Sequence, residues 1–255
     1  MEQKERLQRE FFTRDGLAVA RELLGKILVH ETPLGTVRGI ITETESYMGE
    51  TDKASHAYGG KRTRRTEPMY HIGGTSYVYL IYGMYDCMNI AAMTEGIPQA
   101  VLIRGAEPAD GLSAKRMEIL RLRRAKRRGG KLATETALPE GILPGNVLPE
   151  ESSPKGILPD GSSAKSILPG RHFPEESSPE EPSRLRVPKH LADGPGKLCI
   201  AMGITREDND RDLVTSPDFY VTEGIPVLPG RIRTGKRIGV DYAQEAAEYP
   251  WRFFL

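Results

Sequence analysis

Cysteine is scarce in this chain of 255 residues, which has only Cys87 and Cys199. The two cysteines lie far apart and match no C-x-x-C spacing, so the sequence predicts neither a disulfide framework nor a zinc knuckle. His56 and His71 lie in glycine-bearing loops, but they form no H-x-x-x-H pair. We therefore predict no metal ion and no cofactor, and a reducing compartment fits this composition best.

Long apolar runs are also missing. No stretch approaches the roughly 18 apolar residues that a membrane span requires. The first residues, MEQKERLQREFF, are charged where a secretory signal would need an apolar segment. We therefore expect a soluble, cytoplasmic protein that does not bind a membrane.

The net charge of only +1 hides an uneven distribution. Residues 132–182 carry nine acidic side chains against three basic ones, a net charge of −6 that leaves +7 for the rest. Residues 115–131 contain nine Lys or Arg and one Glu, and residues 61–65 read KRTRR. Such basic runs suit a phosphate backbone, although the first run is equally typical of a solvated helix end.

A low-complexity segment at 129–182 lacks the composition of a folded core. It is rich in Pro, Gly, Ser and Glu, and the sequence PEESSP occurs at both 149–154 and 174–179. Such a segment cannot bury enough apolar surface to fold. We predict a disordered or loosely extended insertion in a single domain of residues 1–255, and we expect deletion of about 132–182 to leave the activity intact.

The remaining sequence alternates between helical and strand patterns. A capped helix is predicted from Asp15 to Leu24, because apolar residues recur at helical spacing and Gly25 follows as a stop. A second helix starts near Gly111, with Leu112, Met117, Leu120 and Leu122 available to pack. β-Branched runs, tight turns and a glycine-rich turn before a further helix predict the other elements: strands at 26–32, 36–48, 76–81, 86–92 and 99–105, and a helix within 193–204.

Tyrosine is concentrated in the predicted strand pair SYVYLIYGMYDCMNI, which holds four of the ten tyrosines. Tyr77 and Tyr79 are two apart on one strand, so both rings face the same side. Tyr82 immediately precedes Gly83, where the chain must reverse, and so projects from a hairpin tip. An exposed aromatic on a turn is a candidate wedge for unstacking bases, whereas the simpler alternative is packing across the strands.

Glu45 is the most informative carboxylate, because strand alternation places it on one face with Glu43 and Tyr47. A general base requires a fixed, partly enclosed carboxylate of this kind. The pattern alone is weak, since most glutamates on strands point to water.

Taken together, these segments resemble the alkyladenine (3-methyladenine) DNA glycosylase family, and the similarity covers almost the whole chain outside 129–182. The motifs occur in the order of the family: ETESYMG at 43–49, SHAYGGKRT at 55–63, SYVYLIYGMYDCMNI at 76–90, VLIRGAEP at 101–108, GPGKLCIAMGI at 194–204 and KRIGVDY at 236–242.

The resemblance implies a mixed α/β (α+β) domain with a curved antiparallel sheet, flanked by helices, whose β-hairpin enters the DNA minor groove. A damaged nucleotide would be flipped into a pocket. By the motifs, Tyr82 is expected to wedge into the duplex, and Tyr47, Tyr79 and the loop of His56 are expected to stack on the flipped base. Asn89 matches the position that excludes normal guanine.

The resemblance also implies the catalytic groups. Glu45 matches the general base that activates water, while Arg104 and the backbone carbonyl of Ile238 match the groups that position this water. No lysine falls at the position of the base, so a monofunctional hydrolysis that leaves an abasic site is expected.

Contacts with DNA follow more loosely from the motifs. Lys61, Arg65 and Lys197 are expected to contact phosphates, and the glycine-rich turn GPGK supplies a backbone-amide nest for one of them. Met84 and Tyr85 are expected to line the minor groove or to pack the hairpin. The expected partner is double-stranded DNA with a damaged purine, bound by a monomer at the nucleoid.

Two other functions fit parts of the sequence. Tyrosines and basic runs also describe a non-catalytic, single-stranded nucleic-acid-binding module, but such a module has no use for Glu45. A carbohydrate hydrolase that uses Glu43 and Glu45 is the second alternative, and it leaves the basic clusters unexplained. The preferred lesion stays open.

Overall fold

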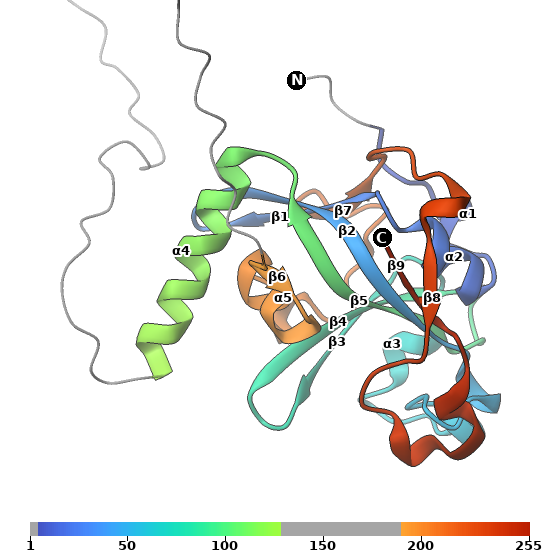
Figure 1. Ribbon diagram of the computed structural model, residues 1–255. Helices are drawn as coiled ribbons and strands as arrows, with labels where there is room; N and C mark the ends of the chain where they lie inside the picture. The colour runs from blue at the N-terminus through green and yellow to red at the C-terminus, as the bar shows by residue number, and fades with distance from the viewer. Residues whose placement is uncertain (1–4, 129–189) are drawn as a thin grey trace, which may run out of the picture.

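The computed structural model describes residues 5–128 and 190–255 of the chain (Figure 1). The predicted insertion at 129–182 lies outside the described residues, and its conformation stays a prediction.

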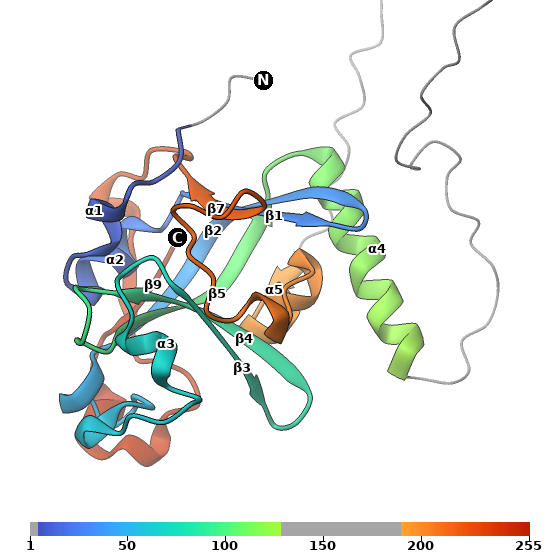
Figure 2. The same ribbon diagram turned by 180° about the vertical axis from the view of Figure 1, so that it is seen from behind.

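One curled antiparallel sheet organises the described residues, with helices packed around it, so the predicted mixed α/β fold is confirmed (Figures 1 and 2). The main path of the sheet runs in the order β3, β4, β5, β2, β1 and β7. β6 pairs with β5, and β9 pairs with both β2 and β8. The strands are β1 (Ile27–Thr32), β2 (Gly35–Tyr47), β3 (Ser76–Ile81), β4 (Tyr85–Ala92), β5 (Gln99–Pro108), β6 (Ala192–Asp193), β7 (Phe219–Thr222), β8 (Arg233–Gly235) and β9 (Arg252–Phe254).

The three predicted helices are confirmed at positions close to those expected, and α1 and α3 were not predicted. α2 begins after Asp15, whose side chain accepts a hydrogen bond from the Leu17 amide at 2.9 Å, and Gly25 follows its end with a φ of 82°. Both features are ordinary helix-capping devices. The α-helices are α1 (Arg9–Phe12), α2 (Gly16–Glu22), α3 (Glu67–Tyr70), α4 (Gly111–Arg128) and α5 (Pro195–Met202).

The long strand β2 is irregular where it approaches the site. Its pairing with β5 shifts between Ile41 and Glu43 and again between Glu43 and Thr44. β9 pairs with β2 over this region, from Glu43 to Glu45. Such irregularities bend and twist a strand and are common beside active sites. The bend immediately precedes Glu45.

The two faces of β2 serve different purposes. Thr44 is buried against α2, where its hydroxyl donates to the carbonyl of Ala20 at 2.7 Å. Alternation along the strand therefore directs Glu45 and Tyr47 to the opposite face, as predicted. The hydrophobic core on the α2 side fixes this register, because a slip by one residue would bury the wrong set of side chains.

α4 and α5 cover the other part of the core, where α5 packs on β4 and β5 and α4 packs on α5 and β2. Met117 is buried and Leu120 packs against the core as predicted, but the expectation for Leu112 and Leu122 is wrong, since they are 46% and 54% exposed. At about 100° per residue, both stand roughly 140° from Met117 around the helix axis. They therefore face away from the side that meets α5.

The β3–β4 hairpin extends beyond the rest of the sheet in both views (Figures 1 and 2). Its last pair is Ile81 with Tyr85, and the Met84 amide donates to the Ile81 carbonyl at 3.0 Å. Tyr82 and Gly83 have φ values of 52° and 63°, and two successive positive φ angles are typical of the type I′ hairpin turn. Tyr82 is 80% exposed, so its predicted projection from the hairpin tip is confirmed.

The loop that follows α5 braces strand β3. The hydroxyl of Ser76 donates to the Asp208 carbonyl at 2.5 Å, and the side chain of Asn209 accepts from the Val78 amide at 2.8 Å. β3 carries Tyr77 and Tyr79, so this loop helps to fix the position of both rings.

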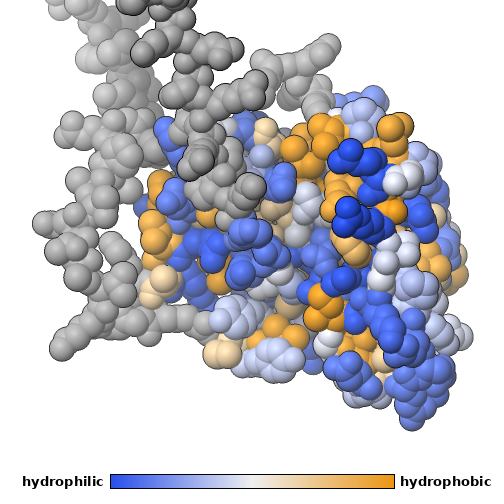
Figure 3. Space-filling model, viewed as in Figure 1, coloured by the Kyte–Doolittle hydropathy of each residue, from blue (hydrophilic) through white to orange (hydrophobic). Residues whose placement is uncertain are grey.

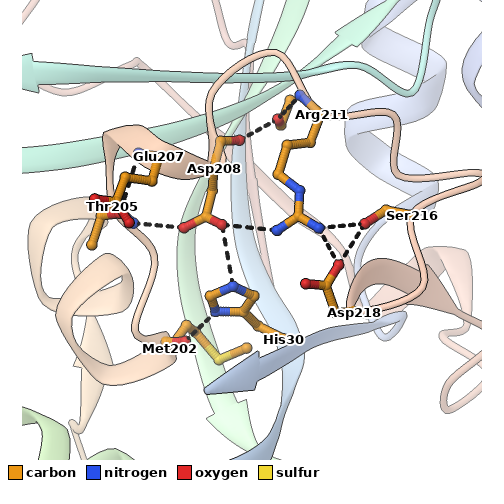
Figure 4. Close-up of polar contacts among 9 residues, drawn as sticks. His30, Met202, Thr205, Glu207, Asp208, Arg211, Ser216 and Asp218 are labelled. Atoms are coloured by element: carbon orange, nitrogen blue, oxygen red, sulfur yellow. Dashed lines mark hydrogen bonds and ion pairs between the residues drawn. The ribbon is translucent and has the colours of Figure 1, made fainter. Parts of the chain in front are cut away.

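A buried polar network holds this loop in turn (Figure 4). The Asp208 carboxylate lies 3.3 Å from Nε2 of His30 on β1 and 3.1 Å from the guanidinium of Arg211, and it accepts from the Thr205 amide at 2.9 Å. Burial disfavours the ionised form, but the hydrogen bonds from His30 and Thr205 outweigh it and hold the pKa of Asp208 below its usual value. Nδ1 of His30 lies 2.8 Å from the Met202 carbonyl at the end of α5. The network therefore joins β1, α5 and the loop behind β3.

Within residues 5–128 and 190–255, no helix combines the length and the apolar character needed to cross a lipid bilayer. The same residues include no group of three or more His, Cys, Asp or Glu side chains arranged to hold a metal ion.

Candidate active site

A cavity of about 330 Å³ opens beside the β3–β4 hairpin. Its volume falls in the range of roughly 300–1,000 Å³ that is typical of small-molecule sites. β2, β3, β4 and β5 contribute one side, and loops around His56 and Ile238 contribute the other. Six of the residues that line it are Tyr47, His56, Tyr77, Tyr79, Asn89 and Arg104.

Aromatic rings form one wall of the cavity. The ring centroids of Tyr77 and Tyr79 lie 5.2 Å apart, and the ring of His56 meets Tyr79 edge-on at 4.7 Å. Tyr77 and Tyr79 face the same side of β3, while Val78 points into the hydrophobic core, as the alternation predicts. Nδ1 of His56 lies 2.9 Å from the Tyr77 hydroxyl, which fixes the loop against the strand.

These aromatic side chains are uncharged at neutral pH. Burial, assisted by the charges of Arg65 and Lys61, lowers the pKa of His56 to about 4. Burial raises the pKa of Tyr77 to about 12 and also raises the pKa of Tyr79. The wall therefore offers neutral π surfaces to a bound ring.

Asn89 lies on β4 directly across from Tyr77 in the strand pair. Its side chain is buried, and Nδ2 donates to the Tyr77 carbonyl at 3.2 Å. This hydrogen bond holds the amide group at a fixed place in the cavity. A rigid polar group in this position is suited to discriminate between rings by shape.

Glu45 is fully buried directly behind the cavity wall. Its Oε2 accepts from the Tyr47 hydroxyl at 2.9 Å, and its Oε1 accepts from the Ile238 amide at 2.8 Å. Nη1 of Arg104 lies 3.4 Å from the same Oε1. All three partners line the cavity, so they connect the carboxylate to it.

The environment of Glu45 makes it a stronger base than an exposed glutamate. Burial raises its pKa, and the opposing effects of Arg104, the Ile238 amide and the Tyr47 hydroxyl do not compensate fully. Two partners contact Oε1, but the Tyr47 hydroxyl is the partner of Oε2, and a carboxylate oxygen has two lone-pair sites. The arrangement can therefore accept a proton from a molecule that reaches the wall.

Glu43 does not share the cavity with Glu45. Its carboxylate accepts from Nε of Arg104 at 3.1 Å and lies 3.6 Å from Arg252. Glu43 and Arg252 line a separate groove, whereas the tyrosines line the cavity. This geometry disfavours the carbohydrate-hydrolase alternative, which required both carboxylates to face one substrate. The guanidinium of Arg104 contacts both carboxylates, Glu43 and Glu45.

A buried ion pair that the sequence did not reveal holds the loop of Ile238. The Arg237 guanidinium donates to Asp52 at 2.5 and 2.9 Å, and both side chains are fully buried. Arg237 also donates to the carbonyls of Ser46 and Ala246, both at 3.0 Å. The motif KRIGVDY, which contains Arg237, could have indicated that this residue matters. A basic residue next to Lys236 is, however, expected on the surface, so the sequence did not predict its burial.

The mouth of the cavity carries exposed apolar and aromatic side chains. Tyr82 and Ile238 line it and are 80% and 51% exposed. Tyr242, which the sequence did not single out, also lines the mouth, and its hydroxyl donates to the Ala54 carbonyl at 3.3 Å. On the molecular face seen in Figure 3, hydrophobic residues form separate patches among hydrophilic ones.

The other hairpin residues have distinct surroundings. Met84 is 43% exposed, and its carbonyl accepts from Arg124 of α4 at 3.1 Å. Tyr85 packs closely against Gly196, where an added Cβ would lie 3.0 Å from the Tyr85 Cβ. Tyr85 therefore contributes to packing between the hairpin and α5.

The three predicted phosphate contacts are all exposed, but they are not equivalent. Lys197 lies in the first turn of α5, next to the packed Gly196. Arg65 lines the cavity, with its guanidinium carbon 5.0 Å from the centroid of the Tyr79 ring, whereas Lys61 does not line it. Their contacts with phosphate stay predictions.

Comparisons with known proteins give one consistent result. The family model described as Methylpurine-DNA glycosylase (MPG) matches residues 10–147 and 165–255. A protein of Clostridium perfringens (strain SM101 / Type A) is 38% identical over 251 residues, which cover 98% of this chain and 95% of the relative. A protein of Desulfitobacterium hafniense (strain Y51) is 40% identical over 250 residues, with the same shares covered. Both relatives bear the name "Putative 3-methyladenine DNA glycosylase".

Proposed function

Because the chain belongs to the methylpurine-DNA glycosylase family, we propose that it is a monofunctional glycosylase that excises alkylated or deaminated purines from double-stranded DNA. The proposed substrates are 3-methyladenine, 7-methylguanine, hypoxanthine and 1,N6-ethenoadenine. The product is an abasic site, which is the starting point of base excision repair. We expect the enzyme to act as a monomer and to associate with the nucleoid.

The observation that carries this proposal is the position of Glu45. A fully buried carboxylate with a raised pKa lies behind a tyrosine-lined cavity and contacts three residues of its wall. A module that only bound nucleic acid would gain nothing from such a group, because it would repel the phosphates of its ligand. A hydrolase requires it as a base.

The proposed reaction needs few groups. A nucleotide flipped out of the duplex places its base between the rings of the cavity, since an enzyme cannot reach the glycosidic bond inside the stack. Glu45 accepts a proton from a water molecule, whose oxygen bonds to C1′ of the sugar as the bond from C1′ to the base breaks. The carboxylate also stabilises the positive charge that develops on the sugar, as in inverting glycoside hydrolysis.

Arg104 and Ile238 orient this reaction in the proposal. Arg104 joins Glu43 and Glu45, and the Ile238 amide fixes the orientation of the Glu45 carboxylate. The Ile238 carbonyl, on the same exposed loop, is proposed to hold the attacking water. Both residues line the cavity, which is consistent with these roles.

Tyr82 is proposed to fill the space that the flipped nucleotide leaves. Its ring projects from a tight turn and is largely exposed, so it is free to enter the duplex. An inserted aromatic side chain can offset part of the unstacking free energy of a few kcal/mol. Met84 comes two residues after Tyr82 in the hairpin and is proposed to lie against the minor groove.

The cavity lining supports the proposed monofunctional mechanism. No lysine is among the cavity-lining residues in the described part of the chain. An amine would be needed to form a Schiff base with the sugar and to cleave the strand. Borohydride should therefore trap no covalent adduct with lesion DNA, and a trapped adduct would contradict this mechanism.

The main experiment uses a labelled duplex with one hypoxanthine or one ethenoadenine and scores strand breaks revealed by alkali. Wild-type protein should produce breaks, whereas Glu45→Gln should bind the duplex but produce none. Glu107→Gln, a matched change at an exposed carboxylate on β5, should keep the activity. Tight binding by the wild type without breaks on either lesion or on methylated DNA would leave a catalytically silent DNA-binding protein.

A further inference from the structure

Arg65 is a cation at the cavity wall that carries the neutral rings of Tyr77, Tyr79 and His56. Its guanidinium carbon lies 5.0 Å from the centroid of Tyr79, within the range of a cation–π interaction. The other cation of the lining is Arg104, which is engaged by Glu43 and Glu45. Among the described residues, no carboxylate forms an ion pair with Arg65, in contrast to Arg104.

The charge of Arg65 acts on the groups that would hold a bound base. It helps to keep His56 neutral, and it opposes the effect of burial on the Tyr77 hydroxyl. Both effects fit the position of the guanidinium over the Tyr79 ring. Arg65 is therefore placed to influence the charge of a ring bound there.

We infer that Arg65 is a specificity-determining residue that favours excision of uncharged purine lesions over cationic ones. This inference rests on the proposed glycosylase function. It differs from the role suggested by the sequence, in which Arg65 contacts a phosphate and has no preference among lesions.

The physical reason lies in the charge of the base before and after the bond breaks. In the hydrolysis, the bond between C1′ and N9 breaks and its electron pair stays on the base, while water oxygen bonds to C1′ and its proton moves to Glu45. An uncharged base such as hypoxanthine therefore leaves with a developing negative charge, which a nearby guanidinium stabilises. A cationic base such as 7-methylguanine leaves neutral and gains no such help.

Binding of the flipped base before the bond breaks gives the same preference for uncharged bases. A base stacked on Tyr79 shares this ring with the guanidinium of Arg65. A second cation on the ring is repelled by the first, because charges separated by several Å in a partly buried site still interact. A neutral base meets no such penalty.

The test measures single-turnover excision of hypoxanthine, ethenoadenine and 7-methylguanine by the wild type and by Arg65→Gln. We expect Arg65→Gln to slow excision of the two neutral bases by about tenfold or more, given the strength of a charge interaction at this range. Excision of 7-methylguanine should be unchanged or faster. Arg65→Lys, which keeps the charge, should retain most of the preference for neutral bases.

Arg64→Gln is the matched control, because Arg64 is an exposed arginine in the same loop that does not line the cavity. It should change all three rates by the same factor. If Arg65→Gln also slows all three equally, with weaker DNA binding and a smaller salt dependence, Arg65 is a phosphate contact and the inference is wrong. If the wild type excises none of the three, the proposed function fails, and the inference fails with it.

Discussion

The backbone amide of Ile238 donates a hydrogen bond of 2.8 Å to Oε1 of Glu45, across 193 positions of the chain. A loop near the C-terminal end thereby fixes the carboxylate on β2. The loop itself is anchored one residue earlier by Arg237, which is buried with Asp52. The orientation of the proposed base therefore depends on an ion pair whose residues do not line the cavity.

Replacing Arg237 with methionine should destabilise the protein strongly. Removal of one partner leaves the Asp52 carboxylate buried without its counter-ion, and such changes cost about 3–5 kcal/mol. Chemical denaturation should show this loss of unfolding free energy. Excision should also fall at temperatures where the variant is still folded, because the Ile238 amide loses its support.

Lys236→Met is the control for this prediction. Lys236 pairs with Glu248 on the surface, and both side chains are more than half exposed. Exposed ion pairs contribute about 0–1 kcal/mol, so the unfolding free energy should hardly change. Equal losses for the two variants would show that the burial of Arg237 has no special importance.

The excision rate should fall at acidic pH, starting above the pH expected for an ordinary glutamate. Glu45 must be ionised to accept a proton from water, and burial raises its pKa above 4.5. As the pH is lowered through the raised pKa, the active ionised fraction decreases and the rate decreases with it. The measurement is a single-turnover pH profile on lesion DNA, with binding measured in parallel so that weaker binding is not mistaken for slower chemistry.

Glu45→Gln should be at least as stable as the wild type at neutral pH. A raised pKa in the folded state means that folding favours the protonated carboxyl, so the wild type loses stability as the pH rises through this pKa. Glutamine cannot ionise and escapes this loss. Thermal unfolding at pH 5 and pH 8 should show a melting temperature difference that grows in favour of the variant at the higher pH. A variant that is clearly less stable at pH 8 would argue against a raised pKa.

Tyr82→Ala should lower excision from a fully paired duplex with little effect on stability. The ring is 80% exposed, and surface substitutions usually change the unfolding free energy by less than about 0.5 kcal/mol. The defect should shrink when the lesion lies in a mismatch or a bulge, because less unstacking is then needed. Tyr58→Ala serves as a control, since Tyr58 is 45% exposed and does not line the cavity. A defect of the same size in paired and bulged DNA would contradict the wedge role.

Local periodicity predicted much of this architecture. Alternation was sufficient to place Glu45 and Tyr47 on one face of β2, because a strand has only two faces. It also placed Tyr77 and Tyr79 on one face of β3. Gly83 was sufficient to locate the hairpin turn and the exposed Tyr82. These relationships depend on residues within a few positions of one another.

Relationships between distant residues could not be predicted in this way. Nothing local shows that Arg237 is buried while Lys236 is exposed, since both are basic and adjacent. Nor does the run KRTRR show that Arg65 turns toward Tyr79, because this depends on how the loop closes over β3. In α4, Leu112 and Leu122 have the residue type of a core but stand on the wrong side of the helix.

Asp208→Asn should weaken the brace behind β3 and affect both stability and excision. The carboxylate is buried and joins His30, Arg211 and Thr205, so its removal should cost about 3 kcal/mol or more.

The lowered pKa of Asp208 predicts how this effect depends on pH. The stability that the carboxylate contributes is present above the pKa of the unfolded state, near 3.8, and is lost as the pH falls through the pKa of the folded state. The difference in unfolding free energy between wild type and variant should therefore be large at pH 7 and should shrink below pH 4. Asp210→Asn is the control, because Asp210 is exposed and, among the described residues, forms an ion pair only with His71. If both variants lose the same stability at every pH, the buried network does not support β3, and the fixed positions of Tyr77 and Tyr79 need another explanation.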